Sequence, residues 1–280
     1  MKLLRVGKKG KEKPAVLDSN GSIRDLSSCL NDFTPENLNF SIIEKLKAID
    51  LQRLPELSKE ERIGPCVSKP GKFVAIGLNY SDHAKEVGAE VPKEPIVFMK
   101  ANSSVCGPND DIEIEKNSKK LDWEVELGII IGKEVKNTEE KDAADHILGY
   151  CLVNDISERE WQIEKLGQWV KGKSHDTYGP IGPYIVTTDE IKDINNLNLS
   201  LDVNEKRMQT GNTKTMIFNV YFIVSYLSKF MSLQPGDIIT TGTPPGVGMG
   251  RKPQVFLKAG DRMKLSIDNL GKQSAKVVSV

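Results

Sequence analysis

Short apolar runs separated by turn residues dominate the chain from Lys72 to its C-terminus. Examples are KFVAIGLNY, PIVFMKA, DIEIE, DWEVELGIII and DIITTGT, each bounded by Gly, Pro, Asn or Asp. Three segments with apolar residues at helical spacing interrupt these runs, near residues 138–147, 157–168 and 213–230. Many short strands with few helices favour a mostly β (α+β) body over a doubly wound α/β sheet.

The first 68 residues have a different character. Two strand-like segments, 1–17 and 22–26, surround Asn20-Gly21, which is a strong hairpin signal. A helical pattern of isoleucine and leucine follows over 42–49, and then a polar stretch rich in Pro and Gly. The sequence therefore predicts a small N-terminal α+β domain over residues 1–68 and a larger domain over residues 69–280.

Composition excludes several classes of function. The 280 residues include 39 basic and 39 acidic side chains, so no excess of charge favours nucleic acid or a membrane surface. No apolar run approaches the roughly 18 residues that span a bilayer. The four cysteines lie far apart without CxxC spacing, which favours reduced thiols in a cytoplasmic protein over a zinc or redox site.

One strand carries the most unusual charge pattern. In LDWEVELGIIIG, residues 121–132, Trp123, Val125 and Leu127 alternate with carboxylates that include Glu124 and Glu126. Residues two apart share one face of a strand, so the two glutamates can converge on one cation. Asp155 ends a second apolar run, ILGYCLVND. Three carboxylates without His or Cys suit Mg²⁺ or Mn²⁺, whereas a solvated edge strand is the alternative.

Two further clusters are candidates for catalysis. His83 and Glu86 are three residues apart in GLNYSDHAKE and share a face if this segment is helical. A carboxylate beside an imidazole raises its basicity, which makes a competent general base; an exposed or capping histidine is the alternative. Arg159 and Gln162 follow Asp155 at helical spacing, but Arg159 could equally pair with neighbouring glutamates in solvent.

Two loops remain ambiguous from the residues alone. Lys173 lies in GQWVKGKS, which fits the GxxxxGK[ST] pattern of a phosphate-binding loop. That loop must follow a strand and open a helix, whereas this one follows a helical pattern and runs into HDTYGPIGP, so nucleotide binding is excluded. Thr243 lies in the rigid loop TTGTPPGVGMG, which could bind a carboxylate or serve only as a tight turn.

Taken together, these blocks resemble the motifs of the fumarylacetoacetate hydrolase family, in order, from about residue 70 to the C-terminus. The resemblance is carried by GLNYSDHAKE, PIVFMK, DWEVELGIIIG, GYCLVNDISERE, WVKGKSHDTYGPIGP, SYLSKFMSLQPGDIITTGTPPGVG and LKAGD. Within the family, the sequence is most similar to 2,4-diketo-3-deoxy-L-rhamnonate/L-fuconate hydrolases, whose relatives include acylpyruvate hydrolases.

The resemblance implies a mixed β-sandwich roll with the active site at its mouth, usually in a homodimer. It implies that three carboxylates hold Mg²⁺ or Mn²⁺ and that a dyad activates water on a segment that can act as a lid. It also implies that a lysine assists catalysis at the substrate and that three further residues bind substrate. The implied sets are, for the metal, Glu124, Glu126 and Asp155; for catalysis, His83, Glu86 and Lys173; and for substrate, Arg159, Gln162 and Thr243.

The implied reaction is metal-dependent hydrolysis of the C3–C4 bond of a small 2,4-dioxo acid to pyruvate and a carboxylic acid. Within this reaction, His83 would deprotonate water and Lys173 would add positive charge where negative charge develops. Two lyase activities, oxaloacetate decarboxylation and hydration or dehydration of a 2-keto acid, could use the same metal site. A non-catalytic metal-binding scaffold is a third alternative.

Overall fold

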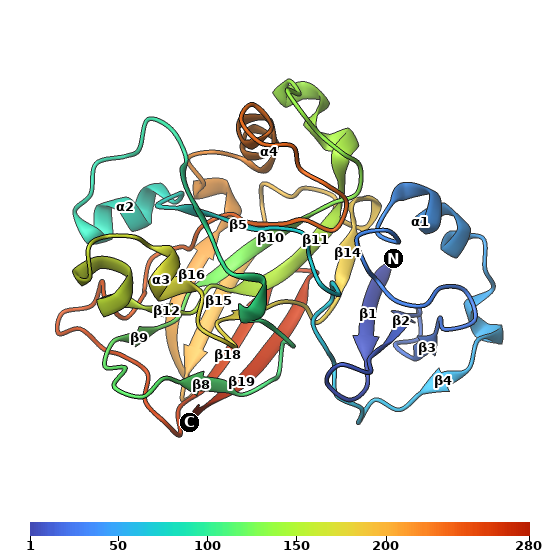
Figure 1. Ribbon diagram of the computed structural model, residues 1–280, viewed down its shortest axis with the longest axis horizontal. Coiled ribbons are helices and arrows are strands. Elements are labelled where there is room, and N and C mark those ends of the chain that lie inside the picture. Colours follow the sequence, from blue (N-terminus) through green and yellow to red (C-terminus); the bar gives the residue numbers. More distant parts are fainter.

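The protein is described from a computed structural model that covers residues 1–280 (Figure 1). Its largest element is a ten-stranded mixed sheet with the order β4-β3-β2-β1-β14-β11-β10-β17-β5-β6. The members of this sheet are β1 (Lys2–Val6), β2 (Lys13–Leu17), β3 (Ile23–Asp25), β4 (Glu56–Leu57), β5 (Phe73–Gly77), β6 (Ile96–Met99), β10 (Val125–Ile131), β11 (Ile147–Asn154), β14 (Ile185–Thr187) and β17 (Ile238–Thr240).

A second sheet of five strands packs beside the first. Its order is β16-β15-β18-β19-β8. These strands are β8 (Ile112–Ile114), β15 (Asn198–Val203), β16 (Lys206–Asn212), β18 (Arg262–Ile267) and β19 (Gly271–Ser279). Two short pairs complete the β structure: β7 (Val105–Cys106) with β13 (Gly179–Pro180), and β9 (Leu121–Asp122) with β12 (Ser157–Glu158). The predicted mostly β fold is confirmed.

Helices are few and short. They are α1 (Phe40–Lys47), α2 (Ser81–Val87), α3 (Val170–Lys173) and α4 (Val220–Ser228). Short 3₁₀ segments occur at Leu51–Arg53, Asn102–Ser104, Glu140–His146, Thr188–Glu190 and Thr213–Thr215, and a π-helical segment at Glu160–Glu164. No helix is both long enough and apolar enough to cross a membrane.

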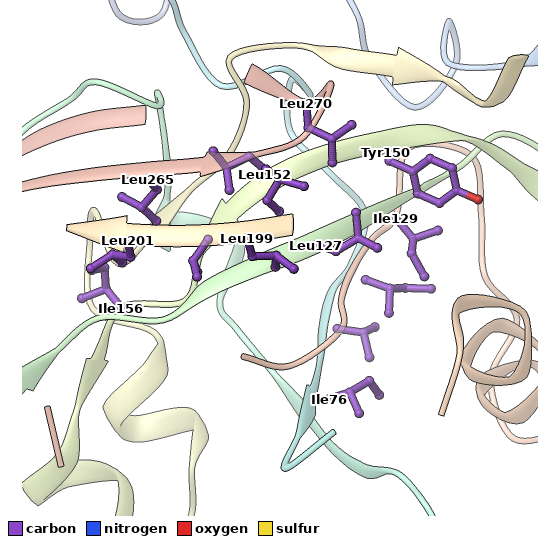
Figure 2. Packing of buried hydrophobic residues seen from close by; sticks show 14 of the residues in the cluster. Ile76, Leu127, Ile129, Tyr150, Leu152, Ile156, Leu199, Leu201, Leu265 and Leu270 are labelled. Carbon is purple, nitrogen blue, oxygen red and sulfur yellow. The ribbon is translucent and has the colours of Figure 1, made fainter. Parts of the chain in front are cut away.

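The central strand β10 separates two hydrophobic cores, because its successive side chains point to opposite faces. Leu127 and Ile129 pack in the larger core between the two sheets, beside Leu152, Leu199 and Leu265 (Figure 2). Ile130 instead joins the second core, which also holds residues of α1 and of β1 and β2. A strand buried on both faces reads as a continuous apolar run, which explains the three consecutive isoleucines.

The N-terminal strands continue the large sheet. β1 pairs antiparallel with β14, and the second core combines Leu3 and Phe33 with Ile130 and Val153 of the body. Figure 1 shows β1 to β4 together at one side of the molecule, next to α1. The division into domains 1–68 and 69–280 stays a prediction, because the sheet itself is continuous across it.

Two of the expected helices differ from the sequence pattern. The segment expected to be helical over 157–168 begins with strand β12 and continues as the π-helical segment. The segment expected over 213–230 becomes helical only at Val220, where the side chain of Asn219 accepts hydrogen bonds from the backbone N–H groups of Tyr221 and Phe222. Asn219 is therefore the N-cap, and such a cap decides where a helix starts more strongly than apolar spacing does.

The hairpin between β15 and β16 contains an unusual turn. Its two central residues, Asn204 and Glu205, have φ values of 48° and 65°. Such a turn needs positive φ at both positions, which glycine and asparagine adopt readily and glutamate does not. The Glu205 side chain makes only an exposed contact with Lys264 at 3.8 Å.

We expect Glu205→Gly to stabilise the protein by about 1 kcal/mol, because relief of the left-handed strain outweighs the entropy lost by glycine and a weak surface ion pair. Urea unfolding followed by circular dichroism measures the change. The matched control is Lys206→Gly, an extended position in β16 where glycine should destabilise. Equal destabilisation by both changes would contradict the strain argument.

Candidate active site

Three carboxylates converge at the ends of the central strands. Glu126 lies on β10 next to Glu124, which precedes the strand, and Asp155 follows the paired strand β11. One oxygen from each of the three carboxylates lies within 4.8 Å of the others, and all three side chains are buried. The sequence-predicted convergence is therefore present in the structure.

The strand between Leu121 and Ile131 is interrupted, which the sequence pattern did not predict. β9 ends at Asp122 and β10 begins at Val125, while Trp123 is fully buried in the larger core. The backbone N–H of Glu124 donates to the side-chain oxygen of Asn154 at 3.2 Å instead of to a neighbouring strand. Asp122 and Glu124 therefore lie on either side of the break in the strand.

Asp122 is fully buried and anchors a loop. Its carboxylate accepts hydrogen bonds from the backbone N–H groups of Gly248 at 2.6 Å and Met249 at 2.9 Å, and from Arg159 Nε at 2.8 Å. Arg159 also donates to Glu124, so Asp122 is connected through this arginine to a member of the carboxylate cluster.

Arg159 and Gln162 are in direct contact. Arg159 Nη1 donates to Gln162 Oε1 at 2.9 Å, and Nη2 donates to Glu124 Oε1 at 2.7 Å. The Gln162 side-chain NH₂ group has no hydrogen-bond partner in the protein, although the residue is only 3% exposed and lines the cavity described below. Arg159 thus orients the other two groups, and Gln162 keeps two free donors.

Lys173 is buried at the centre of the cluster. Its Nζ lies 2.6 Å from Glu124 Oε2 and 2.7 Å from Asp155 Oδ2. The preceding residue, Gly172, makes this possible: a Cβ there would lie 2.4 Å from the carbonyl oxygen of Glu158. Lys173 therefore neutralises carboxylates in a four-residue helix, which agrees with the exclusion of a phosphate-binding loop.

Lys100 is a site residue that sequence reasoning missed. It is 1% exposed, and its Nζ lies 2.6 Å from Asp155 Oδ1, 2.5 Å from the carbonyl oxygen of Lys173 and 3.4 Å from that of Ile156. Burial lowers the pKa of Lys100 below its usual range, against the opposing charge of Asp155. The sequence did contain one indication of this role. Lys100 ends the apolar run PIVFMK, and a lysine at the end of a buried strand needs a buried partner for its charge.

We expect Lys100→Met to weaken Mn²⁺ binding about 10- to 100-fold, because Asp155 and the backbone of Lys173 lose the group that orients them. Isothermal titration calorimetry measures the binding. The control is Lys72→Met, which removes the half-buried ion pair with Asp237 (2.5 Å) away from the carboxylate cluster. If both variants lost stability and neither lost Mn²⁺ affinity, Lys100 would have only a structural role.

Charge is not balanced within this cluster. Burial alone would raise the pKa of Glu124, but the nearby charges of Lys173 and Arg159 outweigh it and lower this pKa to about 2. Burial, with the charges of Asp155 and Glu124, holds the pKa of Glu126 well above its usual range. With all four carboxylates described above ionised, they would exceed the three cationic side chains by one negative charge, and the raised pKa of Glu126 reflects this excess.

A divalent cation fits this donor set. Oxygens bound to one Mg²⁺ at about 2.1 Å can lie up to about 4.2 Å apart, so the three carboxylates need to contract only slightly. The remaining Glu126 oxygen is held by Thr240 Oγ1 at 2.5 Å and by the backbone N–H of Gly242 at 2.8 Å. The three carboxylates could therefore hold Mg²⁺ or Mn²⁺ and relieve the excess negative charge.

His83 and Glu86 form a dyad on α2. His83 Nδ1 lies 2.9 Å from Glu86 Oε2, and Glu86 also accepts from the backbone N–H of Gly246 at 2.9 Å. Burial would raise the pKa of Glu86, but the hydrogen bonds from His83 and Gly246 lower it, so this side chain stays a carboxylate. A carboxylate on Nδ1 leaves Nε2 as the free basic nitrogen.

The structure brings the sequence-predicted residues to one cavity of about 180 Å³. Glu124, Glu126, Lys173 and Thr243 line it together with His83, Arg159 and Gln162. Asp155 and Glu86 lie behind this surface, each in contact with a lining residue. The Thr243 hydroxyl already donates to the carbonyl oxygen of Val125 at 3.0 Å and accepts from Gln209 at 2.8 Å, so its proposed contact with substrate stays a prediction.

The fold and this cavity define an enzyme for a small molecule, with buried charge at its base and a paired histidine on its wall. Residues 72–278 match the family model described as fumarylacetoacetate (FAA) hydrolase C-terminal. This match covers most of the chain, and the protein belongs to the fumarylacetoacetate hydrolase family. The family predicted from sequence motifs is thus confirmed.

Known relatives cover the whole chain. A Burkholderia ambifaria protein named "Putative hydrolase" is 59% identical over 274 residues, which are 98% of this chain and 97% of the relative. The fumarylacetoacetate hydrolase of Exiguobacterium antarcticum is 33% identical, with a TM-score of 0.89 and full coverage of both chains. Maleylpyruvate hydrolase from Sphingobium sp. SYK-6, solved with manganese(II) and pyruvate, is 27% identical with a TM-score of 0.84, covering 100% of this chain and 99% of that one.

Proposed function

We propose that the protein is a Mg²⁺- or Mn²⁺-dependent hydrolase that cleaves the C3–C4 bond of a 2,4-dioxo acid, giving pyruvate and a carboxylic acid. One observation carries this proposal. His83 lines the same cavity as the cluster of three buried carboxylates, and Glu86 lies behind His83 in contact with its ring. Cleavage by water needs a base, and His83 can supply one because its ring lies within hydrogen-bonding distance of the Glu86 carboxylate, which orients it.

Glu124, Glu126 and Asp155 would hold the cation. When bound, the cation supplies a Lewis acid and a template for the oxygens of the substrate. The complex of maleylpyruvate hydrolase with manganese(II) and pyruvate supports this assignment for a relative. The charge balance of the cavity adds a second argument, because a divalent cation would keep Glu126 ionised, would turn the single negative charge of the fully ionised cluster into one positive charge, and would favour a monoanionic substrate.

The side chains of the protein would share the remaining work. His83 Nε2 takes a proton from water, and Glu86 holds the ring and stabilises the imidazolium that forms. The hydroxide attacks C4, the C3–C4 bond breaks, and the electron pair remains on C3 as the enolate of pyruvate. Lys173 contributes positive charge next to this developing negative charge, and protonation at C3 completes pyruvate.

Gln162 is the best-placed neutral donor for the substrate. Its NH₂ group faces the cavity without a partner, and its carbonyl oxygen is fixed by Arg159. Because Arg159 holds the carbonyl oxygen of Gln162, the NH₂ group points the other way and is available to donate to a ligand in the cavity. We therefore assign Gln162 to a substrate oxygen and Arg159 to the orientation of Gln162 and Glu124.

Two other reaction classes remain alternatives to hydrolysis. Oxaloacetate decarboxylation or hydration of a 2-keto acid would also stabilise an enolate at this site. Isomerisation is a further candidate, because a solved structure with 29% identity and a TM-score of 0.85 is described as a probable 2-hydroxyhepta-2,4-diene-1,7-dioate isomerase from Mycobacterium abscessus. None of these three uses water to break a carbon–carbon bond.

The test is a screen for pyruvate release, coupled to lactate dehydrogenase, over several 2,4-dioxo acids and oxaloacetate. Each substrate is measured with Mg²⁺, with Mn²⁺ and after treatment with EDTA. We expect 2,4-dioxo acids to release pyruvate only with added metal and with stoichiometric formation of the second acid. Release only from oxaloacetate, together with CO₂, would identify a decarboxylase instead. The predicted homodimer can be checked on the same sample by sedimentation.

A further inference from the structure

The loop of residues 241–250 follows β17 and contacts both halves of the site. At its start, the backbone N–H of Gly242 donates to Glu126 Oε2 at 2.8 Å, in the carboxylate cluster. Further along, the backbone N–H of Gly246 donates to Glu86 Oε1 at 2.9 Å, in the dyad. The backbone amides of one loop therefore connect the proposed metal ligands with the proposed base.

Two consecutive residues at the break between β9 and β10 hold the far end of this loop. Asp122 Oδ1 accepts a hydrogen bond from the backbone N–H of Gly248 at 2.6 Å, and Asp122 Oδ2 accepts one from that of Met249 at 2.9 Å. The indole Nε1 of Trp123 donates to the carbonyl oxygen of Gly246 at 3.2 Å. The broken strand therefore fixes the part of the loop that binds the dyad.

The loop is closely packed where these contacts are made. A Cβ on Gly248 would lie 1.9 Å from the carbonyl oxygen of Val255 and 2.8 Å from Asp122 Oδ1. Gly246 has a φ of 108°, and a Cβ there would lie 2.0 Å from the carbonyl oxygen of Met208. Only glycine permits such close backbone contacts. Because the loop is packed so tightly, a displacement at Asp122 would be passed along it to the dyad.

Asp122 also reaches the carboxylate cluster, through Arg159. Asp122 Oδ2 accepts from Arg159 Nε at 2.8 Å, and the two Nη atoms of this guanidinium donate to Glu124 and Gln162. With the N–H of Trp123, the carboxylate accepts four hydrogen bonds in all, which fill its lone pairs. It is fully buried and does not line the cavity. It therefore acts on the site only through other residues.

We infer that Asp122 is a positioning residue that sets the distance between the dyad and the carboxylate cluster. It acts on Glu86 through the loop and on Glu124 through Arg159. This inference rests on the proposed function, in which a base on one half of the site activates water for a substrate held at the other. A displacement of about 1 Å between such groups can lower a rate about 100-fold.

Asp122→Asn tests this role, since it keeps the size of the side chain. The amide has one acceptor oxygen, and either orientation turns its NH₂ group toward two N–H donors. We expect kcat for hydrolysis of a 2,4-dioxo acid to fall about 100-fold at saturating Mn²⁺ and substrate. An unchanged kcat would overturn the inference.

The matched control is Asp18→Asn, in the hairpin of β2 and β3. Asp18 is also buried, and it accepts from the backbone N–H groups of Asn20 and Ser22, both at 2.9 Å, and from Arg24 Nε at 2.8 Å. Urea unfolding should show that both variants lose stability, whereas Asp18→Asn should keep its kcat. Equal losses of kcat in the two variants would mean that activity follows stability alone, and Asp122 would then have no positioning role.

A double-mutant cycle shows whether the effect passes through the dyad. Glu86→Gln removes the carboxylate that orients His83, so part of the effect of Asp122→Asn should already be lost in this background. We expect the kcat of the double variant to be at least about tenfold higher than the product of the two single losses predicts. Losses that multiply would show that Asp122 and Glu86 act independently, against the inference.

Amide hydrogen exchange tests the same connection without turnover. Asp122→Asn should speed exchange at least about threefold in residues 246–250 and also in α2, which carries the dyad, whereas Asp18→Asn should change neither segment. Faster exchange in the loop alone would overturn the inference, because the dyad would then be held independently of Asp122. If no 2,4-dioxo acid releases pyruvate, the proposed function fails, while the exchange rates still support or overturn this connection.

Discussion

Replacement of Glu124 by glutamine should reduce metal-dependent pyruvate release by about 10³-fold or more, equivalent to about 4 kcal/mol of lost transition-state stabilisation. Glu124 is a proposed metal ligand and also accepts hydrogen bonds from Arg159 and Lys173. An amide of the same shape keeps one acceptor oxygen but turns an N–H donor toward one of these cations. The loss of charge therefore acts on the metal and on both neighbours.

Two measurements identify the cause of this loss. Calorimetry should show that Glu124→Gln binds Mn²⁺ at least about tenfold more weakly, and urea unfolding should show whether the variant is folded. The control is Glu134→Gln, which removes an exposed carboxylate just beyond β10 and should change neither property. Full activity of Glu124→Gln with normal Mn²⁺ affinity would remove Glu124 from the metal site.

The sequence predicted the fold in those regions where one period dominates. Alternation in residues 123–127 placed Trp123, Val125 and Leu127 in the core, and all three are fully buried there. Periodicity could not show that the strand breaks after Asp122, because that break depends on a contact with Asn154 from another strand. Similarly, apolar spacing over 213–230 could not locate the N-cap at Asn219.

Sequence reasoning found the site residues that lie close together within one motif and missed one that does not. Residues within a motif, such as His83 and Glu86 or Glu124 and Glu126, are brought together by local geometry that their spacing reveals. Lys100 has no such spacing, and it meets Asp155 only because β6 and β11 belong to one sheet. The spacing of residues along the chain does not reveal contacts between distant segments, and sequence reasoning therefore missed this buried lysine.

Replacement of His83 by alanine should separate two reactions that share the metal site. Hydrolysis of a 2,4-dioxo acid should fall about 10²- to 10⁴-fold, since the base that activates water is lost. Decarboxylation of oxaloacetate needs no attacking water, and we expect its rate to change by only a few fold. Coupled pyruvate assays with Mn²⁺ measure both rates on the same preparation.

A matched control exists within the chain. His175 also has a carboxylate neighbour, Glu115 at 3.6 Å, and stacks on Tyr178, but it does not line the cavity. His175→Ala should leave both reactions unchanged, whereas Glu86→Gln should reduce hydrolysis alone by a smaller factor than His83→Ala, because it only disturbs the orientation of the ring. Equal losses of hydrolysis and decarboxylation in His83→Ala would show that the dyad acts on a step common to both, such as proton transfer to the enolate, and the role of His83 in activating water would then be wrong.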